Sequence, residues 1–176
     1  GEILVPFPIE SALSGVMKRV TPEERLWYRR SFTVPAGWNG RRIQLHFGAV
    51  DWQATVFVNG KEVGEHKGGY DPFSFDITAA LGDGEQELVV AVSDPTDAGT
   101  QPRGKQVRRP EGIYYTPVTG IWQTVWIEPV SQTHMTRLLI RPDFDGSAVE
   151  VAATGPGTGG PATFEVEVLD GDEVVA

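Results

Sequence analysis

The stretch Leu45–Asp76, LHFGAVDWQATVFVNGKEVGEHKGGYDPFSFD, decides the fold class because it places a hairpin signal inside a series of short strands. The β-prone run Ala54–Val58 is followed directly by Asn59-Gly60, and Asn-Gly supplies the positive φ angles of a tight type I′ turn. We predict that Lys61–Glu65 is the returning strand. The run Phe73–Asp76 alternates aromatic and polar residues, which is typical of a strand with one face on a core.

Further strands are predicted on both sides of this meander, at Leu26–Val34, Arg41–Phe47, Leu88–Val92 and Ile121–Glu128. The nearly continuous apolar run of the third is typical of a strand buried on both faces. The chain has 21 glycines and 13 prolines, which suits many short strands joined by tight turns. No long 3.6-residue pattern occurs. The sequence therefore predicts an all-β fold, and an antiparallel sandwich of the jelly-roll kind best matches this strand spacing.

A domain boundary is predicted at about residue 130, with a linker at Pro129–Gln132. Residues 1–130 would form the sandwich. Residues 131–176 contain three candidate strands, Thr136–Arg141, Ala148–Ala153 and Thr163–Leu169. Three strands rarely close a sandwich, so we expect the start of a second, truncated β domain. Its unpaired, partly apolar edge predicts either disorder or self-association through the C-terminal strands.

Composition narrows the classes of partner and of chemistry. The formal net charge is −9, which argues against nucleic acid and anionic membranes because both require a basic face. The chain has no cysteine, so disulfides, thiol catalysis and cysteine zinc sites are excluded. No stretch is apolar for long enough to span a membrane. The compartment stays open between cytoplasmic and exported.

No residue pattern predicts a catalytic, metal or cofactor site. The three histidines, His46, His66 and His134, accompany no nucleophile elbow, and a surface or hydrogen-bonding role is expected for each. Asp94 and Asp97 fit no known calcium cage. Among 24 acids, only Glu10 and Glu111 lie in non-repetitive segments where a glycosidase carboxylate would be worth testing.

Aromatic residues give a stronger functional signal. Trp52 follows Asp51 in a predicted loop, Tyr70 follows a double glycine, and Tyr114-Tyr115 precede Thr119-Gly120. Exposed rings beside polar groups suit stacking on a sugar, which has an apolar face and a polar rim. The alternative is that these rings plug the ends of the sandwich. Trp122 and Trp126 are expected in the core.

The segment Ser93–Gly112 has no periodicity, and a loop of this length inside a compact domain is usually functional. Its part Gln101–Pro110 carries four basic residues and no acid. A solvated loop that pairs with acids elsewhere explains this charge, and so does a loop that faces an acidic neighbour or a polar ligand.

Six segments occur in an order that resembles one known family. They are PFPIESALSGV (6–16), LWYRRSFTVP (26–35), the stretch from Leu45 extended to Thr78, ELVVAVSDPTD (87–97), RGKQ (103–106) and TGIWQTVWIEPV (119–130). Together they resemble the N-terminal sugar-binding jelly-roll domain of glycoside hydrolase family 2, which includes β-galactosidases, β-glucuronidases and β-mannosidases. The resemblance covers about Pro6 to Val130, and the remainder is similar to the start of the immunoglobulin-like domain that follows in that family.

The resemblance implies a division of labour. In the family the two catalytic glutamates lie on a TIM barrel downstream of both β domains, so this piece is expected to be non-catalytic and to dock on that barrel. The jelly-roll domain can also send a loop to the active site, where some members place an aspartate shortly before the Gly-Ile of the last strand. That place falls at about Tyr114 here, so an aromatic could line the sugar pocket instead.

The predicted substrate-binding residues are accordingly Asp51, Trp52, Arg103, Lys105, Gln106, Tyr114 and Tyr115. No catalytic residue is assigned, and neither a metal nor a cofactor. The leading hypothesis is an accessory domain of a retaining β-glycosidase whose partner is a carbohydrate. An autonomous carbohydrate-binding module and a structural or adhesion sandwich without a sugar role remain as alternatives.

Overall fold

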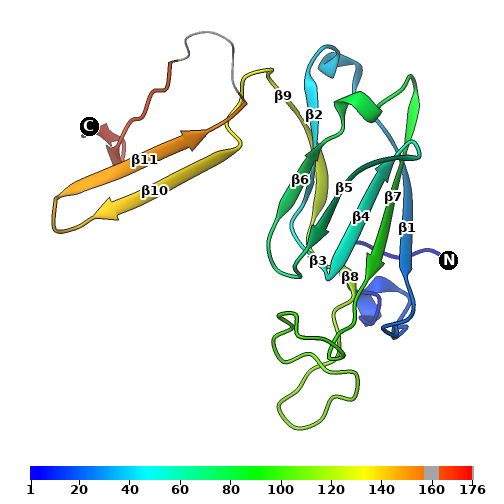
Figure 1. Cartoon of the computed structure of the whole chain (residues 1–176). Helices are drawn as coiled ribbons and strands as arrows, with labels where there is room; N and C mark the ends of the chain where they lie inside the picture. The colour runs from blue at the N-terminus through cyan, green and yellow to red at the C-terminus, as the bar shows by residue number, and fades with distance from the viewer. Residues whose placement is uncertain (157–162, 176) are drawn as a thin grey trace. The chain divides into compact units, whose positions relative to one another are not determined.

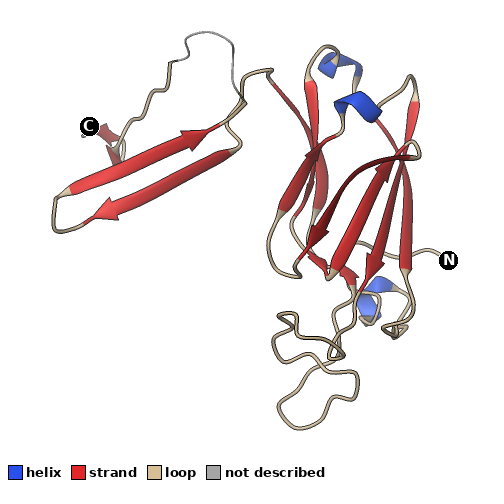
Figure 2. Ribbon diagram, in the orientation of Figure 1, coloured by secondary structure: helices blue, strands red, loops and turns tan. Residues whose placement is uncertain are grey.

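The computed structural model describes residues 1–156 and 163–175, and these form two compact units, Gly1–Pro129 and Val130–Ala176 (Figure 1). The described residues are all-β, as predicted, with antiparallel strands and three single-turn 3₁₀ helices (Figure 2). These short helices are η1 (Ala12–Ser14), η2 (Ala36–Trp38) and η3 (Thr78–Ala80). Within this described part, no helix has the length and hydrophobicity needed to cross a bilayer.

The first unit contains a four-stranded sheet with the order β1-β7-β4-β5. Its strands are β1 (Leu26–Thr33), β7 (Glu85–Ser93), β4 (Gln53–Val58) and β5 (Lys61–Lys67). The predicted hairpin is confirmed, because β4 pairs with β5 across a turn in which Asn59 and Gly60 have φ of 51° and 74°. The Asn59 side chain donates to the Ala80 carbonyl and accepts from the Glu87 amide, which ties the turn to two other segments.

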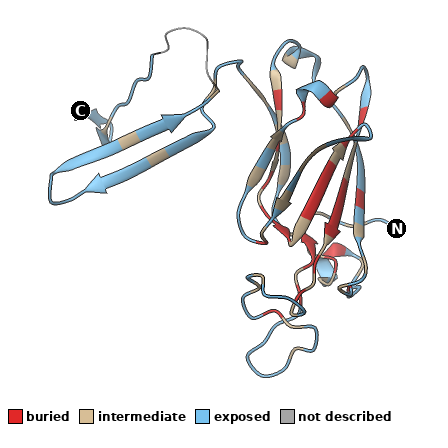
Figure 3. Ribbon diagram, viewed as in Figure 1, coloured by how far each residue is buried: buried red, intermediate tan, exposed pale blue. Residues whose placement is uncertain are grey.

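A three-stranded sheet with the order β6-β2-β9 faces the first one. Its strands are β6 (Phe73–Asp76), β2 (Arg42–Phe47) and β9 (Val125–Val130). The alternation predicted for the second of these is confirmed, since Ile43, Leu45 and Phe47 are each no more than 2% exposed. These side chains meet Val56, Val90 and others from the facing sheet to form one apolar core. Figure 3 shows buried segments, in red, on strands of both sheets.

A pair of two-residue strands, β3 (Val50–Asp51) and β8 (Gly120–Ile121), lies at one end of the sandwich. The predicted strand Ile121–Glu128 is therefore wrong as a single element, because residues 122–124 separate β8 from β9. At this break the Gly48 amide donates to the Thr124 carbonyl. A side chain at Gly48 would lie only 2.6 Å from the Gln123 Cβ, so the close approach depends on glycine.

The prediction that Trp126 lies in the core is wrong. Its side chain is 43% exposed and stacks on His46, with ring centroids 4.8 Å apart. His46 Nε2 also lies 3.0 Å from Glu128 Oε1 but forms no hydrogen bond with the described residues, so a hydrogen-bonding role for this histidine stays a prediction. Trp122 is half-buried and donates its indole N–H to the Gly69 carbonyl at 2.7 Å.

The second unit contains a hairpin of β10 (Arg137–Asp143) and β11 (Ala148–Thr154), and a short pair of β12 (Leu169–Asp170) and β13 (Glu173–Val174). The first two predicted strands are confirmed. The third, Thr163–Leu169, is wrong because residues 163–168 have no strand pairing. Leu138 and Ile140 are 51% and 58% exposed, so this hairpin keeps much of its apolar surface in solvent.

Candidate functional site

The chain between β7 and β8, residues 94–119, forms the long loop at one end of the first unit (Figure 1). Few apolar side chains hold it. Its hydrogen bonds to the sandwich come instead from buried polar groups at its two ends and at its middle. Loop residues that take part in these hydrogen bonds are held against the sandwich, and the other loop residues remain exposed to a ligand.

Gln106 holds the middle of the loop. This side chain is 9% exposed, and its Nε2 donates to Asp51 Oδ2 at 2.9 Å. Its Oε1 accepts from the Val118 amide, so one side chain joins the sandwich end to two parts of the loop. The Asp51 carboxylate packs against the Gly69 backbone, where an added Cβ would lie 2.6 Å from it.

Asp94 and Glu10 hold the ends of the loop. Asp94 Oδ1 accepts from the Thr96 amide at 2.7 Å, and Asp94 Oδ2 accepts from the Thr119 hydroxyl at 2.9 Å. Glu10 Oε2 accepts from the Thr119 amide at 3.0 Å, whereas its buried Oε1 has no partner among the described residues. Tyr28 completes this group, because its hydroxyl accepts from the Ile121 amide at 3.2 Å.

Burial of these carboxyls perturbs their protonation. Removal from water raises the pKa of Asp51 to about 7; the Gln106 hydrogen bond opposes this shift, and the nearby Asp94 and Glu10 charges add to it. Burial also raises the pKa of Glu10, against hydrogen bonds from Thr119, and raises the pKa of Tyr28 to about 12. Asp51 therefore keeps its proton to a higher pH than a solvated aspartate while it holds the loop.

The outer side of the loop carries exposed rings. Tyr114 is 47% exposed and Tyr115 is 66% exposed. The backbone of Tyr115 is fixed, because its amide donates to the Lys105 carbonyl at 2.9 Å and its carbonyl accepts from the Val107 amide at 3.1 Å. Tyr115 lines a shallow cleft of about 390 Å³ together with Glu10 and Pro117. An exposed ring beside a cleft is a group that can stack on a sugar, whereas the Glu10 carboxylate has one oxygen bonded to Thr119 and the other buried.

The basic residues of the loop divide into two groups. Arg108 forms an ion pair with Asp97, and its carbonyl accepts a hydrogen bond from the Arg19 side chain. These contacts stabilise the loop. Within the described residues, Arg103, Lys105 and Arg109 have no ion pair. Arg103 is half-buried, and Lys105 is exposed. Their charges remain available to a polar ligand or to an acidic surface.

Three further aromatic residues, Tyr70, Trp122 and Trp52, lie beside the double glycine Gly68-Gly69. Tyr70 is 48% exposed and meets the half-buried Trp122 edge-on, with centroids 6.2 Å apart. Its hydroxyl lies 3.0 Å from the place where a Gly104 Cβ would be, so this ring touches the loop. Trp52 is half-buried, and its indole N–H has no hydrogen-bond partner among the described residues.

The structure thus divides the predicted site residues into two roles. Asp51 and Gln106 lie inside and contact each other, whereas Lys105, Tyr114 and Tyr115 lie outside on the same loop. Sequence reasoning missed Thr119 and Tyr28 as anchors, since a threonine and a strand tyrosine carry no motif. No group of three or more metal-ligating side chains occurs in the described ranges.

Comparison with known proteins identifies the family to which the chain belongs. The profile of "Glycosyl hydrolases family 2, sugar binding domain" matches residues 3–116. This chain belongs to glycosyl hydrolase family 2. A β-galactosidase from Thermoanaerobacter pseudethanolicus is 36% identical to this family 2 domain, over 73% of the chain and 17% of the relative. A β-glucuronidase from Paenibacillus borealis is 32% identical, over 61% of the chain and 20% of the relative.

Solved structures agree with this assignment. A β-glucuronidase from an uncultured Clostridium species matches with a TM-score of 0.68 and 26% identity, over 87% of this chain and 27% of that one. A Bacteroides uniformis β-glucuronidase matches with a TM-score of 0.53 and 36% identity, over 62% of this chain and 12% of that one. The family 2 domain spans a fifth or less of the length of the two curated relatives described above.

Proposed function

We propose that this family 2 domain is the non-catalytic sugar-binding part of a retaining β-glycosidase, and that its long loop shapes one edge of the parent enzyme's substrate pocket. The observation that carries the proposal is the exposed Tyr115 ring, held on a backbone with two hydrogen bonds beside a cleft that contains Glu10. A rigid ring loses little entropy when a sugar stacks on it.

The proposal gives separate roles to the two groups of site residues. Tyr114 and Tyr115 supply apolar faces, and Arg103 and Lys105 supply donors for hydroxyl or carboxylate oxygens. Asp51, Gln106 and Thr119 do not touch the sugar but hold the loop in place. Hydrolysis of the O-glycosyl bond is assigned to carboxylates of a TIM barrel on which this domain docks.

Kinetic comparison tests this division. The 176-residue chain and the complete enzyme are assayed on 4-nitrophenyl β-galactoside and β-glucuronide. We expect hydrolysis only by the complete enzyme. Hydrolysis by the purified chain, abolished by Glu10→Gln, would refute the non-catalytic assignment. Calorimetric titration of the chain with the same sugars then separates an accessory domain, which gives flat isotherms, from an autonomous binding module, which saturates.

The loop's contribution is tested in the complete enzyme with Tyr115→Ala. Loss of a stacking ring worth about 1 kcal/mol raises KM about three- to tenfold. Trp27→Ala is the matched control, because Trp27 is 57% exposed on the outer face of β1, where it stacks on Phe57. Equal kinetic constants for Tyr115→Ala and the parent enzyme would remove this loop from the substrate pocket.

For the second unit we propose the beginning of an immunoglobulin-like domain that pairs with other strands. Apolar side chains of its hairpin, such as Leu138 and Ile140, are exposed in the chain alone. Strand pairing between copies would cover them. Sedimentation of the 176-residue chain between about 5 and 200 μM is expected to show a mass above that of the monomer, and Leu138→Lys with Ile140→Lys should restore the monomer. A monomer throughout would contradict self-association.

A further inference from the structure

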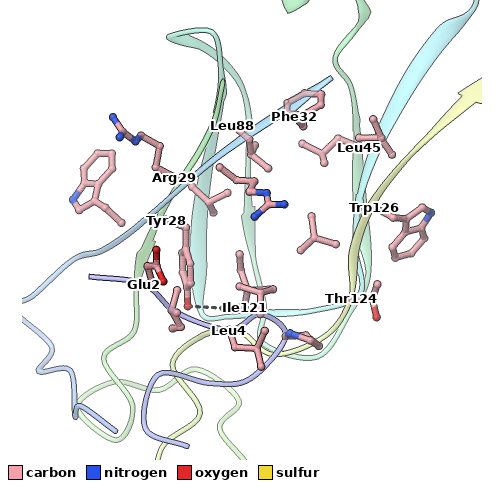
Figure 4. A pocket seen from close by; sticks show the side chains of 18 of the residues that line it. Glu2, Leu4, Tyr28, Arg29, Phe32, Leu45, Leu88, Ile121, Thr124 and Trp126 are labelled. Carbon is pink, nitrogen blue, oxygen red and sulfur yellow. Dashed lines mark hydrogen bonds between the residues drawn. The ribbon is translucent and has the colours of Figure 1, made fainter. Parts of the chain in front are cut away.

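The hollow on the open side of the first unit is lined mainly by apolar side chains, such as Phe32, Leu45 and Ile121 (Figure 4). Groups with a reactivity of their own lie instead at the end of the unit opposite the long loop (Figure 1). Two turns there contain the dipeptide Asn-Gly, at Asn39-Gly40 and at Asn59-Gly60. Glycine has no side chain to shield its backbone nitrogen, so in this dipeptide the nitrogen can attack the side-chain amide of the asparagine.

The two dipeptides form a matched pair in sequence. An apolar residue precedes each asparagine, Trp38 in one turn and Val58 in the other. A basic residue follows each glycine, Arg41 in one turn and Lys61 in the other. The two asparagines should therefore react at similar rates in the unfolded chain, where neighbouring residues alone decide the rate. A difference between them in the folded protein has to come from the structure around each turn.

The structure leaves Asn39 free to react. Asn39 is exposed, and its side chain makes no hydrogen bond within the described part of the chain. Gly40 has φ 76° and open space around it. The Arg41 amide donates to the Trp38 carbonyl at 3.1 Å, and the Asn39 amide donates to the Ala36 carbonyl at 3.3 Å. Only these backbone hydrogen bonds of an exposed turn oppose the rotation that brings the Gly40 nitrogen to the Asn39 side chain.

Asn59 is held by its side chain. Its Nδ2 donates to the Ala80 carbonyl at 2.9 Å and to Gln86 Oε1 at 2.7 Å. Its Oδ1 accepts from the Glu87 amide at 2.9 Å. These three hydrogen bonds have to break before the Gly60 nitrogen can approach the side-chain carbon. A carboxylate formed at this place would also face two acceptors, the Ala80 carbonyl and Gln86 Oε1, where the native amide supplies the donor.

We propose that Asn39 is a site of spontaneous deamidation, and that Asn59, which carries the same sequence signal, is protected by its hydrogen bonds. The Gly40 nitrogen gives its proton to a solvent base and forms a bond to Asn39 Cγ. The bond from Cγ to the side-chain nitrogen breaks, and that nitrogen takes up a proton and leaves as ammonia. Water then opens the cyclic imide, at Cγ to give aspartate or at the backbone carbonyl to give isoaspartate.

No oxidant or reductant takes part in this reaction, and water is its only co-reactant. Either product adds a negative charge to the turn between β1 and β2. Because this turn lies at the end of the sandwich opposite the long loop, the inference is independent of sugar binding (Figure 1).

Peptide mapping of the complete enzyme tests the proposal. Trypsin releases the two asparagines on separate peptides, residues 31–41 and 43–61. The folded enzyme is kept in mildly alkaline buffer for days, and mass spectrometry measures the deamidated fraction of each peptide after the aspartyl and isoaspartyl forms are separated. Deamidation at Asn39 is expected to be about 100-fold faster than at Asn59, because three hydrogen bonds protect the latter. In guanidinium chloride the two rates should agree within about threefold.

Two variants separate the causes. Gly40→Ala should slow deamidation at Asn39 about tenfold, because the added methyl group shields the attacking nitrogen. Gln86→Leu removes one acceptor of the Asn59 amide and should speed deamidation at Asn59 about fivefold, with the Asn39 rate unchanged. If Gln86→Leu fails to fold, the comparison of folded and unfolded parent enzyme decides. Equal rates at Asn39 and Asn59 in the folded enzyme, or an Asn39 that stays intact when folded and reacts when unfolded, would overturn the proposal.

Discussion

Asp51→Asn is the most informative single substitution, because it removes a buried charge and keeps the shape of the side chain. Asp51 is 4% exposed, and burial raises the pKa of its carboxyl to about 7. The oxygen of the new side-chain amide can still accept the hydrogen bond from Gln106 Nε2, and an amide is close enough in size to fit against the Gly69 backbone. The substitution therefore isolates the electrostatic cost of the carboxylate.

The sign and size of the effect follow from proton linkage. The folded protein holds the Asp51 proton up to about pH 7, whereas the unfolded chain releases it near pH 4, so stability falls as pH rises between these values. The total loss is about 4 kcal/mol, of which about 2 kcal/mol falls between pH 5.5 and pH 8. An asparagine side chain cannot titrate. Its stability advantage over aspartate should therefore grow by about 2 kcal/mol over that interval.

Urea unfolding followed by tryptophan fluorescence measures this difference. All five tryptophans lie in the first unit, so the signal reports the unit that contains Asp51. Work at pH 5.5 and 8 avoids the isoelectric point near 4.8, where solubility is lowest. Asp83→Asn, in the exposed turn after η3, controls for the loss of one negative charge. A stability difference between Asp51→Asn and the parent that is the same at both pH values would refute the reasoning.

Three further substitutions test the fold by the same unfolding measurement. Gly120→Ala should lower the free energy of unfolding by about 3 kcal/mol or more, because Gly120 has φ 90° and an added Cβ would lie 2.0 Å from the Tyr28 hydroxyl. Gly82→Ala is the control, because Gly82 has open space around it, and it should lower that free energy by less than about 0.5 kcal/mol. Similar losses for the two substitutions would contradict the clash. Asn59→Ala should lower the free energy of unfolding by about 2–3 kcal/mol, because the hydrogen bonds of the Asn59 side chain are lost. A loss no larger than that of Asn39→Ala, at an exposed position, would disprove that the Asn59 side chain stabilises the turn. Tyr28→Phe should cost about 1 kcal/mol by freeing the buried Ile121 amide, and an unchanged midpoint would show that this hydrogen bond contributes nothing.

Local sequence patterns were sufficient to predict most strands of the first unit. The Asn59-Gly60 turn and the alternation of Arg42–Phe47 depend on neighbouring residues alone, and both were predicted from the sequence. The break between β8 and β9 was not predictable in this way. It depends on Gly48, which is distant in the sequence and allows Gln123 to approach.

The candidate site shows the same limit. Asp51 was predicted to bind a ligand because it lies next to the aromatic Trp52, and Gln106 because the resemblance to family 2 implied that Arg103–Gln106 belongs to the face of the sugar pocket. Their burial arises only when the long loop folds over the sandwich end, 55 positions along the chain from Asp51. The exposed positions Tyr114 and Tyr115 were predictable, since polar surroundings and Gly- and Pro-rich flanks mark a surface loop.

The attachment at Gln106 has a consequence for variation among enzymes of this kind. Because the long excursion is tethered at its midpoint, it behaves as two short arches rather than one wide one, and each arch closes at a smaller entropic cost. Residues can be exchanged or inserted in either arch while the tether and the sandwich stay unchanged. Divergence toward new sugars, or laboratory redesign, could therefore proceed at the crests of the arches without any change to the core.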